Sequence, residues 1–195
     1  MKKIILLLMA VFTLSACHRQ KQVPTTEPID RVLNVDEFIS ADNADMASKY
    51  ENYVWYETQV VLSNFLDEEY EGVAEVTNVF QVTTGDGTSY DTKVIMYTHT
   101  TSEDNVQEIH SFWVEDFPLE EVELGYEQAL AQLNAVNCIK PHSRQVCLRR
   151  EIGPLPCNAQ WVFGNTHKQL YIDALDGRFR ENSPAFPLGQ KKWPQ

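Results

Sequence analysis

The side chains that could carry out acid, base or nucleophilic chemistry are few and widely spaced in this 195-residue chain. His99 and His110 stand on neighbouring predicted strands and could approach each other, with a purely structural pair as the alternative. Five carboxylates that could hold a divalent cation gather in one stretch: Glu115, Asp116, Glu120, Glu121 and Glu123. They lack the spacing of a calcium loop, so solvated charge is the simpler interpretation. The sequence has no serine-nucleophile elbow, phosphate loop or His-Glu-x-x-His motif, and we expect no catalytic residue, metal or cofactor.

The first seventeen residues have the three parts of a signal peptide. Lys2-Lys3 supplies positive charge, residues 4–13 form a short apolar run, and Leu14-Ser15-Ala16-Cys17 ends the segment with small residues before a cysteine. This tetrapeptide resembles the bacterial lipoprotein motif, which implies cleavage after Ala16 and acyl chains such as palmitate on Cys17. A spanning helix would need about 20 apolar residues, whereas polar residues follow at once.

The lipoprotein resemblance also implies a location. Residue 18 is His rather than the Asp that retains lipoproteins in the inner membrane, which implies the outer membrane. The residues after Cys17 lack an acidic run for export to the cell surface, so we expect the protein to face the periplasm. Each buried methylene of an acyl chain contributes about 0.8 kcal/mol, enough for two or three chains to anchor the protein. The inner membrane and the cell surface stay open as alternatives.

Charge is unevenly distributed along the mature chain of 179 residues. Residues 17–127 contain 24 acidic and 5 basic side chains, whereas residues 128–195 contain 4 acidic and 9 basic ones. The acidic half would repel phosphates, which argues against a nucleic-acid partner. It could instead meet a basic protein or a cation, attract the basic half, or simply keep the protein in solution.

Three cysteines remain beyond the lipidation site, and an oxidising compartment would allow one disulfide. We expect Cys138 to pair with Cys147, because a helix antiparallel to the following strand brings both to one end of a unit. Cys157 then stays unpaired. The alternation of that strand points Cys147 away from the face of its neighbours, so the pairing stays open. The spacing of the cysteines and histidines matches no zinc site.

Residues 17–34 are polar, include two prolines and lack an apolar period, which predicts a flexible tether. Ser40 and Asp42 then offer capping oxygens before apolar residues spaced by three, four and seven, which predicts a helix over 43–69. Alternating patterns predict an antiparallel meander of three strands at 73–83, 93–101 and 106–117. The helix would cover this sheet, and the acidic unit would span residues 35–118.

The second half repeats this order over residues 119–182. A helix over 126–136 follows Gly125, and strands are predicted at 145–151, 159–164 and 169–174. Asp176-Gly177 predicts a tight turn after the last of them. Residues 183–195 include three prolines and are expected to form an irregular tail.

Four runs in the second half match the pattern of one family of envelope domains. These runs are Leu124-Gly125-Tyr126-Glu127-Gln128-Ala129-Leu130, Cys147-Leu148-Arg149-Arg150, Gln160-Trp161-Val162-Phe163 and Leu170-Tyr171-Ile172-Asp173-Ala174-Leu175-Asp176-Gly177. They resemble a PepSY domain over residues 123–179, best at Tyr171, Asp173, Ala174 and Gly177. Gly125 departs from the usual Ser or Thr cap, at little cost. The expected fold class is therefore α+β, with two PepSY-like or cystatin-like helix-plus-antiparallel-sheet units behind a signal peptide and tether.

The PepSY resemblance implies a binding or inhibitory module without catalytic residues. We therefore expect a lipid-anchored, non-enzymatic envelope protein that binds or regulates a protein or peptide partner, with protease inhibition among the implied roles. An envelope hydrolase whose site is assembled from sequence-distant residues is one alternative. A structural outer-membrane lipoprotein is the other.

Overall fold

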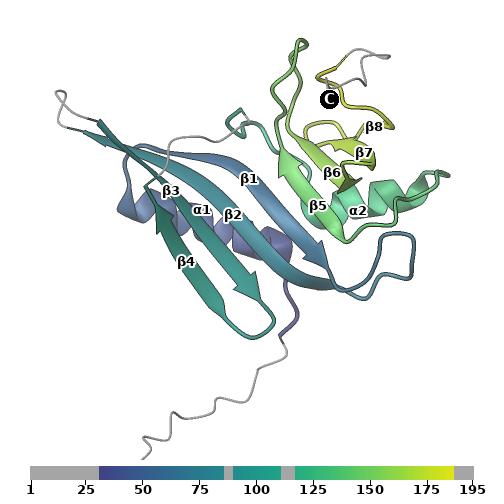
Figure 1. Cartoon of the computed structure of the whole chain (residues 1–195), viewed down its shortest axis with the longest axis horizontal. Coiled ribbons are helices and arrows are strands. Elements are labelled where there is room, and N and C mark those ends of the chain that lie inside the picture. The colour runs from purple at the N-terminus through teal and green to yellow at the C-terminus, as the bar shows by residue number, and fades with distance from the viewer. Residues whose placement is uncertain (1–30, 86–89, 111–116, 187–195) are drawn as a thin grey trace, which may run out of the picture.

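The computed structural model describes residues 31–85, 90–110 and 117–186. The predicted signal peptide and lipidated Cys17 lie outside these residues. The described chain forms two helices and one eight-stranded antiparallel sheet of order β4-β3-β2-β1-β5-β6-β7-β8 (Figure 1), which confirms the α+β class. The elements are α1 (Val35–Lys49), β1 (Tyr53–Leu62), β2 (Val73–Gly85), β3 (Tyr90–Thr100), β4 (Asp104–Ile109), α2 (Tyr126–Ala135), β5 (Gln145–Arg149), β6 (Gln160–Asn165), β7 (Lys168–Asp173) and β8 (Phe179–Arg180).

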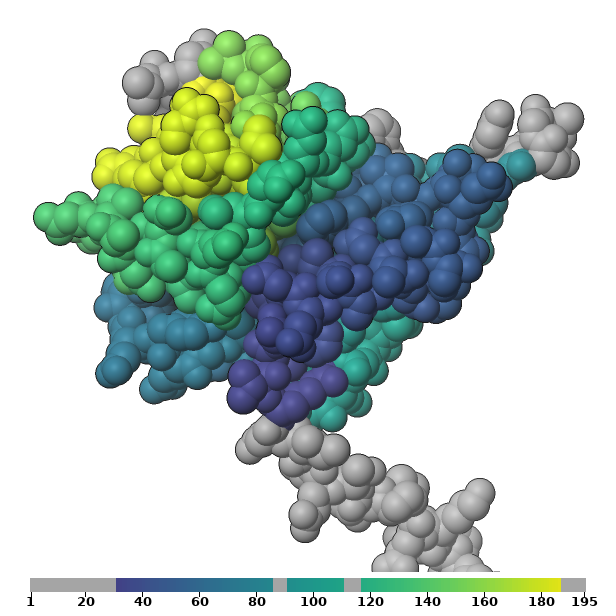
Figure 2. Space-filling view, turned by 180° about the vertical axis from the view of Figure 1, so that it is seen from behind, coloured from purple at the N-terminus to yellow at the C-terminus, as the bar shows by residue number. Residues whose placement is uncertain are grey.

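Each half of the chain runs as one helix followed by four antiparallel strands, and the two halves share a single sheet. The join is the antiparallel pair of β1 and β5, in which Val60 lies opposite Val146. Both helices lie on the same side of the sheet, as Figure 2 shows from behind with α1 in purple to blue and α2 in green. Residues of both halves form the larger apolar core, with Val60 and Leu62 from the first and Trp161 and Phe163 from the second.

The predicted helix over 43–69 is wrong, because α1 ends at Lys49 and the chain enters β1 at Tyr53. β1 is a central strand whose backbone pairs with β2 on one side and β5 on the other. Its sequence, Tyr-Val-Trp-Tyr-Glu-Thr-Gln-Val-Val-Leu, is rich in the aromatic and β-branched residues that pack well on a sheet. The three, four and seven spacing across this region therefore does not reflect one helix.

The start of α1 also differs from the prediction. The cap is Asn34, whose Oδ1 accepts the backbone N–H of Glu37 at 3.2 Å, and neither Ser40 nor Asp42 caps the helix. Leu33, within the predicted tether, is buried in the core. The ordered domain therefore begins before residue 35.

The other predicted elements agree with the structure to within a few residues, with two exceptions. α2, β2, β3, β5, β6 and β7 lie where the patterns predicted them. β4 occupies 104–109 rather than 106–117, and the short β8 was not predicted. The expected turn is present, since Gly177 adopts a φ of +74° and donates its N–H to the carbonyl of Asp173 at 2.9 Å. Over the described residues, neither helix is long and apolar enough to cross a membrane.

Candidate functional site: an exposed edge strand backed by a buried polar network

β4 forms one outer edge of the sheet, and all six of its residues are exposed. The opposite edge, β8, is only two residues long. Proteins commonly blunt a sheet edge by shortening it, because unpaired backbone groups attract other strands. β8 is blunted in this way, whereas β4 presents a full-length edge (Figure 1).

The hairpin between β3 and β4 determines which backbone groups face outward. Thr100 donates its N–H to the carbonyl of Glu103 at 2.9 Å, and inward and outward residues alternate from there along an antiparallel ladder. The N–H and C=O groups of Asp104, Val106 and Glu108 therefore point away from β3. This row offers up to six hydrogen-bonding groups to an added strand.

The side chains of that outward row lie on the helix side of the sheet. They lie opposite buried residues of β3, in the pairs Asp104 with His99, Val106 with Tyr97 and Glu108 with Ile95. Val106 is 56% exposed, and Glu108 lies 2.7 Å from Lys93. The edge thus presents an acidic, an apolar and an acidic side chain in alternation with the uncharged Asn105 and Gln107.

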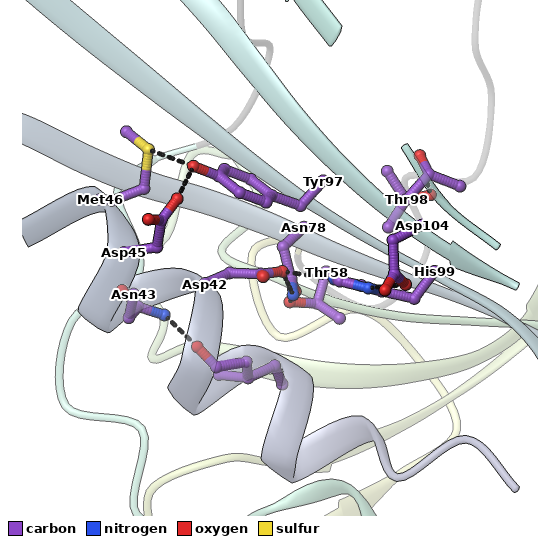
Figure 3. Close-up of polar contacts among 12 residues, drawn as sticks. Asp42, Asn43, Asp45, Met46, Thr58, Asn78, Tyr97, Thr98, His99 and Asp104 are labelled. Atoms are coloured by element: carbon purple, nitrogen blue, oxygen red, sulfur yellow. Dashed lines mark hydrogen bonds and ion pairs between the residues drawn. The ribbon is translucent and has the colours of Figure 1, made fainter. Parts of the chain in front are cut away.

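A buried chain of polar contacts holds the first residue of β4 to helix α1 (Figure 3). Asp42 reaches from α1 to the sheet, where its Oδ2 accepts from Asn78 Nδ2 at 2.7 Å and lies 2.9 Å from His99 Nε2. The other ring nitrogen of His99 lies 2.6 Å from Asp104 Oδ1. At the far end, the Thr58 hydroxyl donates to Asn78 Oδ1 at 2.5 Å. The network therefore joins α1 to four consecutive strands of the sheet.

His99 faces a carboxylate through each ring nitrogen, which limits where the proton can lie. A neutral imidazole has one N–H, whereas an ionised carboxylate only accepts. The two contacts therefore require either an imidazolium or a proton on one carboxyl group. Burial raises the pKa of Asp42, against the opposing effect of its hydrogen bonds from Asn78 and His99, so a proton shared between Asp42 and His99 satisfies the geometry.

Arg31 completes the network at the surface. Its guanidinium hydrogen-bonds the Asp104 carboxylate, with Nη1 3.0 Å from Oδ2, and its Nε donates to the carbonyl of Thr100 at 3.0 Å. It also lies 5.2 Å from the ring centroid of Phe38, which stacks on His99. The guanidinium lowers the pKa of Asp104 to about 2. Arg31 thus ties the segment that enters α1 to the turn before β4.

The polar network separates two apolar clusters beneath α1. Along the helix-facing side of β2, Val76 belongs to the larger core, Asn78 to the network and Phe80 to a smaller cluster with Met46. A buried polar group is costly unless its partners are well placed, so such a network favours one alignment of helix on sheet. We conclude that the network sets the position of β4 relative to α1.

A second polar contact ties α1 to β3. The Tyr97 hydroxyl donates to Asp45 Oδ2 at 2.5 Å (Figure 3). Lys49 Nζ lies 2.5 Å from the same oxygen. Burial and this hydrogen bond raise the pKa of Tyr97. Tyr97 therefore acts as a neutral donor that orients the helix.

The structure does not bring the two predicted histidines together as a pair. His99 is buried in the network, whereas His110 is exposed near Asp91 and Glu108. Glu115 and Asp116 lie outside the described residues; Glu120 lies 3.5 Å from Arg150, and Glu121 and Glu123 are exposed. Within the described ranges, no group of His, Cys, Asp and Glu side chains has the geometry to hold a metal ion.

The predicted disulfide is not formed, since no bond joins Cys138 to Cys147 in the described structure. Cys138 packs against the core on the helix side. Cys147 lies between Val146 and Leu148, which point into that core, so its own side chain points to the opposite face of the sheet. The sheet separates the two sulfur atoms, and Cys157 is not disulfide-bonded either.

The residues that resemble the closing PepSY pattern have local structural roles. Asp173 Oδ1 accepts the backbone N–H groups of Leu175 and Asp176 at 3.0 and 3.3 Å, which shapes the turn that ends at Gly177. Ala174 is fully buried, and its carbonyl accepts from the segment before α2. This pattern therefore builds the turn and joins it to the α2 entry.

Two surface cavities, of about 210 and 240 Å³, lie away from the network. The first lies between the β1–β2 loop and α2, and the second between the end of α1 and the end of β2. Neither is lined by a His, Ser or Cys, and His99 borders neither. Neither cavity thus places a serine or cysteine beside a histidine.

Few features of the sequence indicate the exposed edge or the polar network. Asn78 stands in the buried register of its strand between Val76 and Phe80, and a polar residue there marks a buried hydrogen bond. The pattern around Asp42 indicates a helix cap rather than a buried contact. Comparison of the chain with protein-family models, curated proteins and solved structures gave no match.

Proposed function

We propose that this protein is a lipid-anchored, periplasm-facing envelope protein that acts as a non-enzymatic binding module, with β4 as its docking edge. The observation that carries the proposal is the full-length edge, in which all six residues are exposed and every second residue points its backbone N–H and C=O outward. Addition of a partner strand to such an edge is a common mode of peptide recognition, since main-chain hydrogen bonds supply much of the affinity.

The charge of the first half supports a basic partner. Described residues from 31 to 110 contain 15 acidic and 3 basic side chains, whereas described residues from 117 to 186 are nearly balanced. A field of one sign accelerates the encounter with an oppositely charged protein and repels like-charged ones. The acidic half would therefore steer a basic segment towards β4.

Site-specific photo-crosslinking in intact cells tests the docking edge. We expect a crosslinking residue at Val106 to capture a discrete partner that the same residue at Ile139, exposed on the other half of the molecule, does not capture. Identical products from both positions would contradict the proposal. The anchor is tested separately with Cys17→Ser: we expect loss of membrane fractionation, and persistent membrane association would refute lipidation.

A further inference from the structure

We infer that the β4 edge binds an extended segment in which two basic residues flank an apolar residue, each two positions away from it. This inference rests on the proposed function and specifies the chemistry of the partner. It follows from the register of β4. The residues whose backbone groups point outward, Asp104, Val106 and Glu108, include both acidic side chains of the edge.

The length of the segment follows from the backbone. Three residues of β4 point their N–H and C=O groups outward, namely Asp104, Val106 and Glu108. A strand that pairs with all three must place five consecutive residues along the edge, because side chains repeat on one face every second residue. The first, third and fifth residues of that segment then share a face with the outward row.

The charge pattern follows from the side chains of the same row. The side chains of Asp104 and Glu108 are 51% and 43% exposed. Asp104 already contacts Arg31 and His99, and Glu108 contacts Lys93 and lies 3.7 Å from His110. A carboxylate can accept about four hydrogen bonds, so each retains capacity on its exposed side. Opposite charges directly across an antiparallel pair stabilise it, and Val106 between them favours an apolar neighbour.

The side chains on the other face of β4 do not favour charged residues in the partner strand. Asn105 and Gln107 are uncharged and Ile109 is apolar, and all three face the side of the sheet opposite the helices. The second and fourth residues of the bound segment therefore need no charge. Basic residues are useful on only one face of the occupant, which distinguishes this pattern from a general attraction to positive charge.

Self-pairing of the edge is disfavoured by the same row. If two copies paired β4 with β4 in antiparallel fashion centred on Val106, Asp104 of each copy would lie opposite Glu108 of the other. Like charges directly opposite one another destabilise a strand pair. Charge repulsion thus disfavours antiparallel β4–β4 pairing centred on Val106, whereas a basic strand avoids this repulsion.

Fluorescence polarisation with the full chain in non-ionic detergent tests the pattern. The probe is a labelled peptide Ser-Thr-Lys-Thr-Val-Thr-Lys-Thr-Ser, whose first lysine lies opposite Glu108 in an antiparallel pairing centred on Val106. The control is Ser-Thr-Thr-Lys-Val-Thr-Lys-Thr-Ser, which has the same composition but places that lysine on the opposite face. We expect the probe to bind about two- to fivefold more tightly, the value of one cross-strand charge pair. Glu108→Gln should abolish this preference, whereas Glu103→Gln, outside the outward row, should retain it.

A backbone variant separates this inference from the proposed function. Val106→Pro removes an outward N–H without removing a β3 hydrogen bond, and an edge strand tolerates proline at such a position. We expect Val106→Pro to weaken both peptides at least tenfold relative to Val106→Ala, at equal unfolding temperatures. Equal affinities for the two peptides, or no binding of either, would overturn the charge pattern. With the crosslinking residue moved to the exposed Gln107, a partner crosslink in cells that persists in Val106→Pro would instead overturn the docking edge.

Discussion

The Asp36 carboxylate accepts the backbone N–H of Tyr126 at 2.8 Å, so the first turn of α1 caps the start of α2. Its second oxygen lies 3.5 Å from the N–H of Glu127. A helix N-terminus leaves several N–H groups without partners, and a carboxylate there also interacts favourably with the helix dipole. This contact joins residues 90 positions apart and explains why α2 needs no Ser or Thr cap of its own.

Removing this cap should destabilise the protein. We expect Asp36→Ala to lower the free energy of unfolding by about 1 kcal/mol, the usual value of an N-cap side chain. Glu37→Ala is the matched control, because Glu37 is exposed in the same turn. Urea unfolding followed by tryptophan fluorescence measures both variants, and equal losses would mean that the contact with α2 contributes nothing.

Gly125 should be required by the same contact. A Cβ at this position would lie 2.7 Å from Asp36 Oδ2, closer than atoms normally pack. We therefore expect Gly125→Ala to lower the free energy of unfolding by about 1 to 3 kcal/mol, as overpacking does. In an Asp36→Ala background the cost should shrink, because the clash is removed. A double-mutant cycle that is additive would contradict this explanation.

Asn78 should be the most sensitive member of the polar network. It is fully buried and contacts both Thr58 and Asp42, so Asn78→Ala removes a donor and an acceptor at once. An unsatisfied buried group costs about 1 to 3 kcal/mol, and we expect a loss of that size in thermal or urea unfolding. Gln81→Ala, on the half-buried opposite face of β2, should cost less. A smaller effect at Asn78 than at Gln81 would argue against a supporting role.

Asp104 should make stability fall in acid. Arg31 lowers its pKa in the folded protein from an ordinary value of 3.8 to about 2. Its ionised form therefore favours folding, and that contribution is complete above about pH 4 and is lost as the pH falls through 2. Asp104→Asn and Arg31→Gln should each lose less stability than wild type between pH 4.5 and 2.5 in urea titrations. Because Asp104 is half exposed, the difference should shrink in high salt. An unchanged slope in both variants would show that the pair does not contribute.

Reductant should not change stability, because the sheet lies between the Cys138 and Cys147 side chains. We expect the same unfolding temperature with and without dithiothreitol, and a free-thiol titration that detects both cysteines in the denatured protein. If reduction lowered the unfolding temperature and Cys138→Ser lowered it by the same amount, the result would show that the disulfide forms.

Several elements were determined by the sequence alone because their signals are local. The alternation in β2 and β3, the apolar face of α2 and the turn at Asp176-Gly177 each lie within about ten residues. Such patterns reflect which face of a segment is buried, and they need no knowledge of the partner. The lipoprotein anchor on Cys17 is likewise a prediction from contiguous residues.

Only the tertiary structure decided the role of residues 50–69 and the nature of the site. The same aromatic and apolar residues satisfy a helical spacing and a strand composition, and β1 is a strand because β2 and β5 pair with its two edges. Asp42, His99 and Asp104 meet because α1 crosses the sheet at Asn78, although up to 62 residues separate them in the chain. Long-range pairing leaves no periodic trace in the sequence. The exposed edge exists for the same reason, since the strand order of the described sheet leaves β4 at one end.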